Sequence, residues 1–198
     1  EDGSISKIIT NPKAMVIGDV RYPSKIFQLW SKSELNNIGI YEVITDSTNK
    51  KDEAYYINTN EEYNFTDNQV TRSWGTATPK RLEDENAVDE NGDPVLDDDG
   101  VQLINYGLKT DKKRIIKQQA SGLLEKTDWH NHKAFDDETY TIPNNIKTYR
   151  ANVRAKSNEM ETQIDACTTV QELETLYTYT EQDDGSVTRP LAEFPKEI

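Results

Sequence analysis

The stretch that decides the fold runs from Ile142 to Tyr177 and reads IPNNIKTYRANVRAKSNEMETQIDACTTVQELETLY. Its apolar residues recur at steps of 3, 4, 7, 4 and 3, the spacing of one helical face: Ile146, Tyr149, Val153, Met160, Ile164 and Cys167. Pro143 suits the first turn, where its missing N–H would have no intrahelical partner. The charged residues fall on the solvent side: Arg150, Arg154, Lys156, Glu159, Glu161 and Asp165. The stretch therefore predicts a two-sided helix of about seven turns, which the rest of the chain must cover.

The composition limits the size of the hydrophobic core that can pack against this helix. The chain has 198 residues, enough for one domain or two small ones. Its hydrophobic fraction of 34% is low beside the usual ~45–50%, so the core must be thin or completed by a partner. The net charge of −13 argues against nucleic acid or anionic membrane, because phosphate binding needs clustered Lys and Arg. No apolar run approaches the ~20 residues of a membrane helix, so we expect no membrane insertion. No signal peptide is visible, and the start at Glu1 rather than Met is compatible with residues lost upstream.

The N-terminal part reads as β-rich with one short helix. Residues Ile5 to Val20 alternate loosely around Asn11-Pro12 and predict two short strands. A helix of one or two turns follows, and the strand Ile40 to Ile44 comes after it. Three features mark that helix: a capping box from Ser31 to Glu34, a hydrophobic staple of Trp30 with Leu35, and a left-handed stop at Gly39.

Residues Ala54 to Trp74 predict an antiparallel meander that turns at Asp67-Asn68. The Tyr, Trp and Asn side chains of this sheet are compatible with a glycan-binding face. We favour the alternative, in which the rings are core aromatics whose hydroxyl groups reach the surface.

Residues Lys80 to Tyr106 are acidic and poor in apolar side chains, which favours a loop or loose hairpin. An EF-hand needs a ligand five residues before its Gly, but Gly92 has Ala87 there and Gly100 has Val95. A looser cation site is the alternative to a solvated loop, and it would use Asp93, Asp97, Asp98 and Asp99.

A second helix is predicted from Leu108 to Lys126. The segment TDWHNHKAFDDETY follows it, and in an extended conformation Asp128, His130 and His132 would share one face as a metal triad. We favour a solvated loop, because ligands on one strand converge poorly. The single cysteine, Cys167, is expected to be a small buried hydrophobe.

The C-terminal part predicts a short third helix after Thr168-Thr169 and a hairpin that turns at Asp184-Gly185. The whole chain therefore reads as α+β, an antiparallel β-rich part followed by a helical part with a terminal hairpin. We expect a β-rich domain over 1–78, an acidic linker over 79–107 and a helical domain over 108–198. The pattern assigns no catalytic, cofactor-binding or metal residues and no cofactor.

Two stretches resemble tail-associated structural proteins of tailed bacteriophages. The first is RYPSKIFQLWSKSELNNIGIYEV, residues 21–43. The second is GLLEKTDWHNHKAF, residues 122–135, continued by the helical stretch above and by RPLAEFP, residues 189–195. His130 stands where the resemblance leads us to expect an aromatic residue.

The resemblance implies a non-enzymatic virion structural protein of the tail, which joins or decorates tail parts. Its partners would be copies of itself and other virion tail proteins, and its location the phage particle. The first alternative is a host-surface glycan receptor-binding module of the tail. The lesser alternatives are a metal-dependent hydrolase and a fibre-assembly chaperone.

Overall fold

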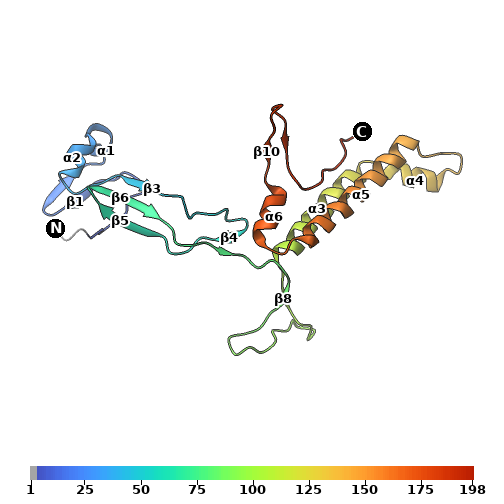
Figure 1. Ribbon diagram of the computed structural model, residues 1–198, viewed down its shortest axis with the longest axis horizontal. Coiled ribbons are helices and arrows are strands. Elements are labelled where there is room, and N and C mark those ends of the chain that lie inside the picture. Colours follow the sequence, from blue (N-terminus) through green and yellow to red (C-terminus); the bar gives the residue numbers. More distant parts are fainter. Residues whose placement is uncertain (1–3) are drawn as a thin grey trace. The chain divides into compact units, whose positions relative to one another are not determined.

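The computed structural model describes residues 4–198, which form two compact units, one up to Thr78 and one of Pro79–Ile198 (Figure 1). The chain is α+β, as the sequence predicts, with small sheets first and helices afterwards.

The first unit opens with a β-hairpin and two short helices. Strands β1 (Met15–Ile17) and β2 (Val20–Tyr22) pair antiparallel. Helices α1 (Ile26–Leu29) and α2 (Lys32–Asn36) follow. The capping box of α2 is confirmed. The Ser31 Oγ accepts from the Glu34 amide at 3.3 Å, and the Glu34 carboxylate accepts from the Ser31 amide at 2.8 Å.

A three-stranded sheet follows in the order β3-β6-β5, with β3 (Val43–Thr45), β5 (Glu62–Thr66) and β6 (Gln69–Ser73). The β5–β6 pair is the predicted hairpin. Its turn residues Asp67 and Asn68 have φ values of 52° and 59°, the left-handed conformation that a tight hairpin requires. The short strands β4 (Tyr56–Ile57) and β7 (Thr78–Pro79) lie outside this sheet.

Three details of the first unit differ from the sequence-based expectation. Residues 5–10 contain no strand, and both strands of this region, β1 and β2, lie after Asn11-Pro12 and flank Gly18. The strand expected over Ile40 to Ile44 is β3, three residues further on, and it pairs with β6 in parallel. Helix α1 was not expected, and its apolar anchor is Ile26, which is 4% exposed.

The second unit begins with strands β8 (Glu85–Asn86) and β9 (Ile104–Asn105) and continues with helices. Helices α3 (Leu108–Glu125) and α5 (Asn144–Ala166) lie side by side, and the shorter α4 (Asp128–Asp136) connects them (Figure 1). The ion pairs Lys113–Asp165 and Lys117–Glu161 show that α3 and α5 run antiparallel. Helix α6 (Val170–Tyr177) and a hairpin of β10 (Thr180–Glu181) and β11 (Val187–Thr188) complete the unit.

The apolar face of α5 forms the core of this unit, as the spacing predicts. Val153, Met160 and Ile164 are at most 1% exposed. Leu173 of α6 and Leu191 of the following segment are equally buried, and the Leu191 amide donates to the Leu176 carbonyl at 3.0 Å. The expectation that Arg150 faces solvent is wrong, because this residue is only 7% exposed.

Candidate functional site

The segment with Asp128, His130 and His132 is the helix α4, so the prediction of a solvated loop is wrong. A helix turns by ~100° per residue, so His130 projects away from the side shared by Asp128 and His132. His130 is buried and its Nδ1 lies 2.5 Å from the Tyr140 hydroxyl, whereas Asp128 is ion-paired with Arg150 at 2.7 Å. The three side chains therefore do not form a triad. Within residues 4–198, no group of three or more His, Cys, Asp or Glu side chains is placed to hold a metal ion.

Arg150 is the principal polar contact of the helical core. Its Nη1 donates to the Leu124 carbonyl at 2.8 Å and to the Thr127 hydroxyl at 2.7 Å, and its Nη2 pairs with Asp128. The Leu124 carbonyl, at the end of α3, also accepts from the Thr127 amide at 3.0 Å and from the Thr127 hydroxyl at 2.9 Å. The buried guanidinium thus binds the end of α3 and the start of α4 at the same time, which explains why it does not lie on the solvent side of α5.

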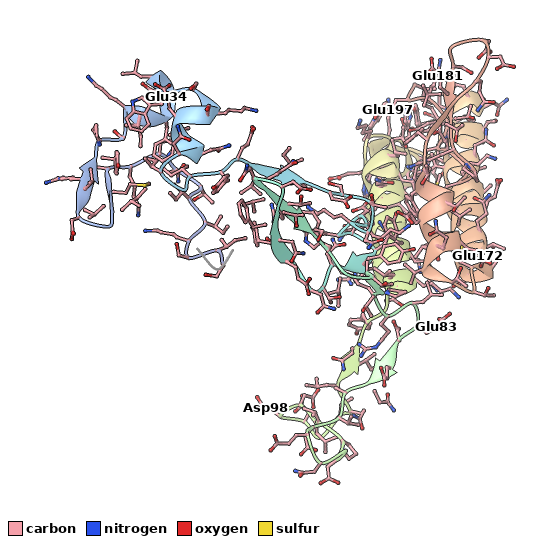
Figure 2. The ribbon with its side chains drawn as sticks, turned by 60° about the vertical axis from the view of Figure 1, so that its left-hand side comes forward. Glu34, Glu83, Asp98, Glu172, Glu181 and Glu197 are labelled. Carbon is pink, nitrogen blue, oxygen red and sulfur yellow. The ribbon has the colours of Figure 1, made fainter. Side chains whose placement is uncertain are left out.

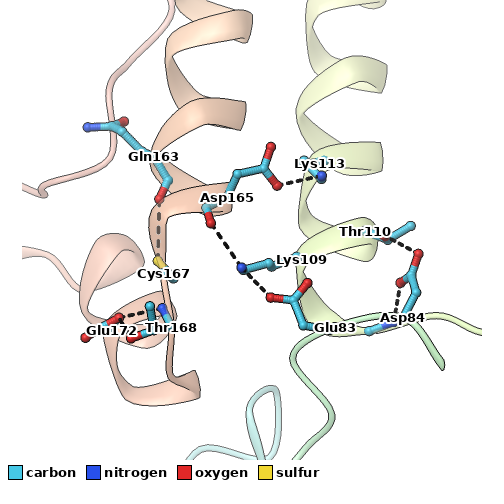
Figure 3. Close-up of polar contacts among 11 residues, drawn as sticks. Glu83, Asp84, Lys109, Thr110, Lys113, Gln163, Asp165, Cys167, Thr168 and Glu172 are labelled. Atoms are coloured by element: carbon cyan, nitrogen blue, oxygen red, sulfur yellow. Dashed lines mark hydrogen bonds and ion pairs between the residues drawn. The ribbon is translucent and has the colours of Figure 1, made fainter.

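A second polar cluster surrounds the start of α3 (Figure 3). The Lys109 ammonium, on a side chain 10% exposed, pairs with Glu83 and donates to the Asp165 carbonyl at 3.0 Å. Asp84 accepts from the Gly107 amide at 2.8 Å and from the Thr110 hydroxyl at 2.9 Å. The Gly107 hydrogen bond is the main reason that the pKa of Asp84 is lowered. These contacts fasten residues 83–84 to α3 and to the end of α5.

Cys167 closes α5 beside this cluster and is buried, as the sequence predicts. Its Sγ lies 3.5 Å from the Gln163 carbonyl (Figure 3), and burial raises the pKa of the thiol. A raised pKa reduces the thiolate fraction, which is the nucleophilic form of cysteine. We therefore assign the Cys167 side chain to the hydrophobic core.

The acidic segment between β8 and β9 is more regular than the loose hairpin expected. Asp89 accepts from the amides of Asn91 and Asp93 at 2.8 and 2.9 Å. Eight residues later, Asp97 accepts from the amides of Asp99 and Val101 at 3.0 and 2.8 Å. The Asp93 amide is the main cause of the lowered pKa of Asp89. Of the cation ligands considered above, Asp97 is bound by its own turn, and the four carboxylates are not among any group that the described residues place to hold a metal ion.

The same segment closes on itself through a ring of three main-chain hydrogen bonds. Val95 donates to Ala87 at 3.0 Å, Leu103 donates to Val95 at 2.9 Å, and Ala87 donates to Leu103 at 2.8 Å. The three residues are spaced by eight along the chain. The ring therefore joins three hairpin arms, which are related by an approximate threefold repeat. Two arms end in the turns at Gly92 and Gly100, and the third is the β8–β9 pair. We call residues 86–104 the three-armed junction. Figure 2 labels Asp98 within it and Glu83 beside α3.

The aromatic side chains of the first unit are mostly covered. Tyr55, Tyr56 and Trp74 are 5 to 7% exposed. The Trp74 ring has two cations over it, Arg72 at 4.6 Å and Lys50 at 5.0 Å from the ring centroid. Such rings are not open for stacking on a sugar, and this arrangement agrees with the interpretation of the aromatics as core residues.

Large apolar side chains are exposed in both units. The most exposed are Phe135 at 88% and Leu29 at 76%. On α4, Trp129 is also 54% exposed, although its ring stacks on His130 with centroids 3.7 Å apart. Exposed apolar side chains are typical of surfaces that contact other molecules where they form a contiguous patch.

No protein-family model matches this chain, and comparisons with curated proteins and with solved structures also give no match. Among the helices of the described residues, none is long and apolar enough to cross a membrane.

Proposed function

We propose that this chain is a non-enzymatic structural protein of a bacteriophage virion, a tail or tail-fibre-associated component that joins or decorates tail parts. It acts as a homo-oligomer in contact with other tail proteins. The two stretches quoted above support the class of protein by their resemblance to tail-associated chains.

The observation that carries the proposal is the large surface area. The chain exposes 14173 Å². Two separate, compact monomeric domains with the sizes of the two units would expose roughly 11,500 Å². The difference of roughly 2,700 Å² exceeds the ~1,600 Å² that a standard protein interface buries, so a contact of that size between the units would not remove it. An excess of this kind is typical of chains that bury more surface when they assemble.

The apolar side chains support the same proposal. Among the described residues, nineteen large hydrophobic side chains are exposed, whereas sixteen hydrophobic residues are buried. Assembly with cyclic symmetry would cover part of this surface in every copy.

Two measurements test the proposal. Mass spectrometry of purified particles of the phage that encodes this chain should find it at a fixed ratio to known tail proteins. Sedimentation velocity of the purified protein should show a concentration-dependent oligomer. A chain abundant in infected cells but missing from particles would be an assembly chaperone, and selective binding to a glycan array would favour the receptor-binding alternative. A monomer at high concentration that joins no virion protein would contradict the proposal.

A further inference from the structure

The three-armed junction has one face formed by three pairs of side chains. Paired residues of antiparallel strands project their side chains to the same side of the ladder. The pairs are Val88 with Pro94, Leu96 with Gln102, and Ile104 with Asn86. Val88, Leu96 and Ile104 are spaced by eight residues, as are Asn86, Pro94 and Gln102 and the three members of the hydrogen-bonded ring. The approximate threefold repeat therefore places all six side chains on the same face.

That face is mostly apolar and uncovered. Val88, Leu96 and Ile104 are 55%, 52% and 45% exposed, and Pro94 is exposed beside them. Gln102 lies among them, half-buried, and its Nε2 donates to the Ala87 carbonyl at 2.6 Å. The amide is thereby satisfied by the main chain. We call Val88, Pro94, Leu96 and Ile104 the apolar face of the junction.

The turns around this face are negatively charged. No Lys or Arg occurs between Arg81 and Lys109. Asp89 and Asp97 are engaged by their own turns, but four other carboxylates have no partner within residues 4–198: Glu90, Asp93, Asp98 and Asp99. An apolar centre with charged residues around it is the usual composition of a protein–protein contact.

The charges around the apolar face of the junction indicate which kind of molecule can bind there. A second copy is disfavoured because the chain carries a net charge of −13. Its own densest group of cations is already paired: Lys109 with Glu83, Lys113 with Asp165, Arg114 with Asp111, and Lys117 with Glu161. Nucleic acid and anionic lipid would be repelled by the same carboxylates.

We propose that the apolar face of the three-armed junction is a docking site for a different protein, whose surface presents apolar side chains surrounded by Lys and Arg. This inference does not depend on the proposed virion role. Within a virion, the partner would be another structural protein of basic character.

The test uses the full chain and two synthetic peptides of equal positive charge, one of alternating lysine and leucine and one of alternating lysine and glycine. Binding is followed by amide chemical shifts. The lysine–leucine peptide should shift the amides of residues 86–104 and bind about tenfold more tightly than the lysine–glycine peptide. Equal affinities, or shifts that lie elsewhere in the chain, would show that only net charge is involved and would overturn the proposal.

Substitutions locate the contact. The double variant Val88→Ser with Leu96→Ser should abolish the preference for the leucine peptide. Val101→Ser is the matched control, because Val101 is 59% exposed in the same segment but alternates onto the opposite face. The double variant Asp98→Asn with Asp99→Asn should weaken both peptides alike. An equal loss with Val101→Ser would contradict the assignment of the face. Self-association that disappears in the Val88 and Leu96 variant would assign the face to a second copy and contradict the choice of partner.

Discussion

The Arg150 guanidinium of α5 donates to the Leu124 main-chain oxygen of α3 at 2.8 Å. This hydrogen bond links the end of α3 to α5, two helices that are separated along the chain by α4. A charged side chain that is 7% exposed is stable only when its donors are satisfied. Here they are satisfied by a carbonyl, a hydroxyl and the Asp128 carboxylate.

Arg150→Met should therefore lower the free energy of unfolding by about 2–3 kcal/mol, because the charge-assisted hydrogen bonds to the Leu124 carbonyl and the Thr127 hydroxyl are lost. Asp128 contributes less to this loss because its side chain is 45% exposed. Chemical denaturation measures the change. The control is Arg154→Met one turn later, where the side chain is exposed and the change should stay within about 0.5 kcal/mol. Equal effects of the two substitutions would contradict the role of Arg150.

Substitution by Ala should change stability in opposite directions at Gly107 and at Gly122. A Cβ at Gly107 would lie 2.4 Å from the Glu83 carbonyl carbon and oxygen, whereas a Cβ at Gly122 would have nothing within 4 Å. Gly107→Ala should cost at least about 1–3 kcal/mol, because the main chain of residues 82–83 must move. Gly122→Ala, inside α3, should raise stability by about 0.5–1 kcal/mol through helix propensity. Thermal unfolding of both variants tests the prediction, and a stable Gly107→Ala protein would contradict this packing.

Asp84 should make the stability of the second unit depend on pH. Its folded-state pKa is lowered from the ordinary value of 3.8, so the stabilisation is present above that value and is lost as the pH falls through the folded pKa. Asp84→Asn should therefore unfold more easily than the wild type at pH 7, and the difference should shrink below about pH 4. Melting temperatures between pH 2 and pH 7 measure this. A difference that is constant across the range would exclude the charge as its cause.

The capping box of α2 predicts a purely structural role for its residues. Ser31→Ala should cost about 0.5–2 kcal/mol. Trp30→Ala should cost more, because the half-buried Trp30 ring packs edge-to-face on Tyr22 with centroids 5.8 Å apart. Both variants should assemble normally once folded, as sedimentation can show. Full stability with lost assembly in Trp30→Ala would instead make this ring a partner contact.

The sequence predicts the elements whose signals are local. Helices α3, α5 and α6 follow from apolar spacing, and α2 follows from its cap. Helix α4 is missed because it has no apolar stripe. Its buried residue is His130, so tertiary contacts with Tyr140 and Arg150 determine its conformation. The sequence does not predict the burial of Arg150 either, because this burial depends on where the end of α3 lies in the folded protein.

Two turns of the three-armed junction could have been predicted from the sequence. The turns around Gly92 and Gly100 share the pattern Asp-x-Asn/Asp-Gly at a spacing of eight, and this repeat is the signal. Composition alone suggests a solvated loop, because it takes no account of carboxylates that bind their own main chain. The ring that joins Ala87, Val95 and Leu103 is a non-local contact, which no local pattern reveals.

The parallel pairing of β3 with β6 sets an order of events when the first unit folds. Strands β5 and β6 are joined by a two-residue turn, and such a hairpin closes in about 1–10 μs. Strand β3 must then close a loop of more than twenty residues before Val43 can reach Val70. We therefore expect the hairpin to be the folding nucleus. Substitutions at Asp67 or Asn68 should slow folding, while substitutions at Val43 should mainly speed unfolding.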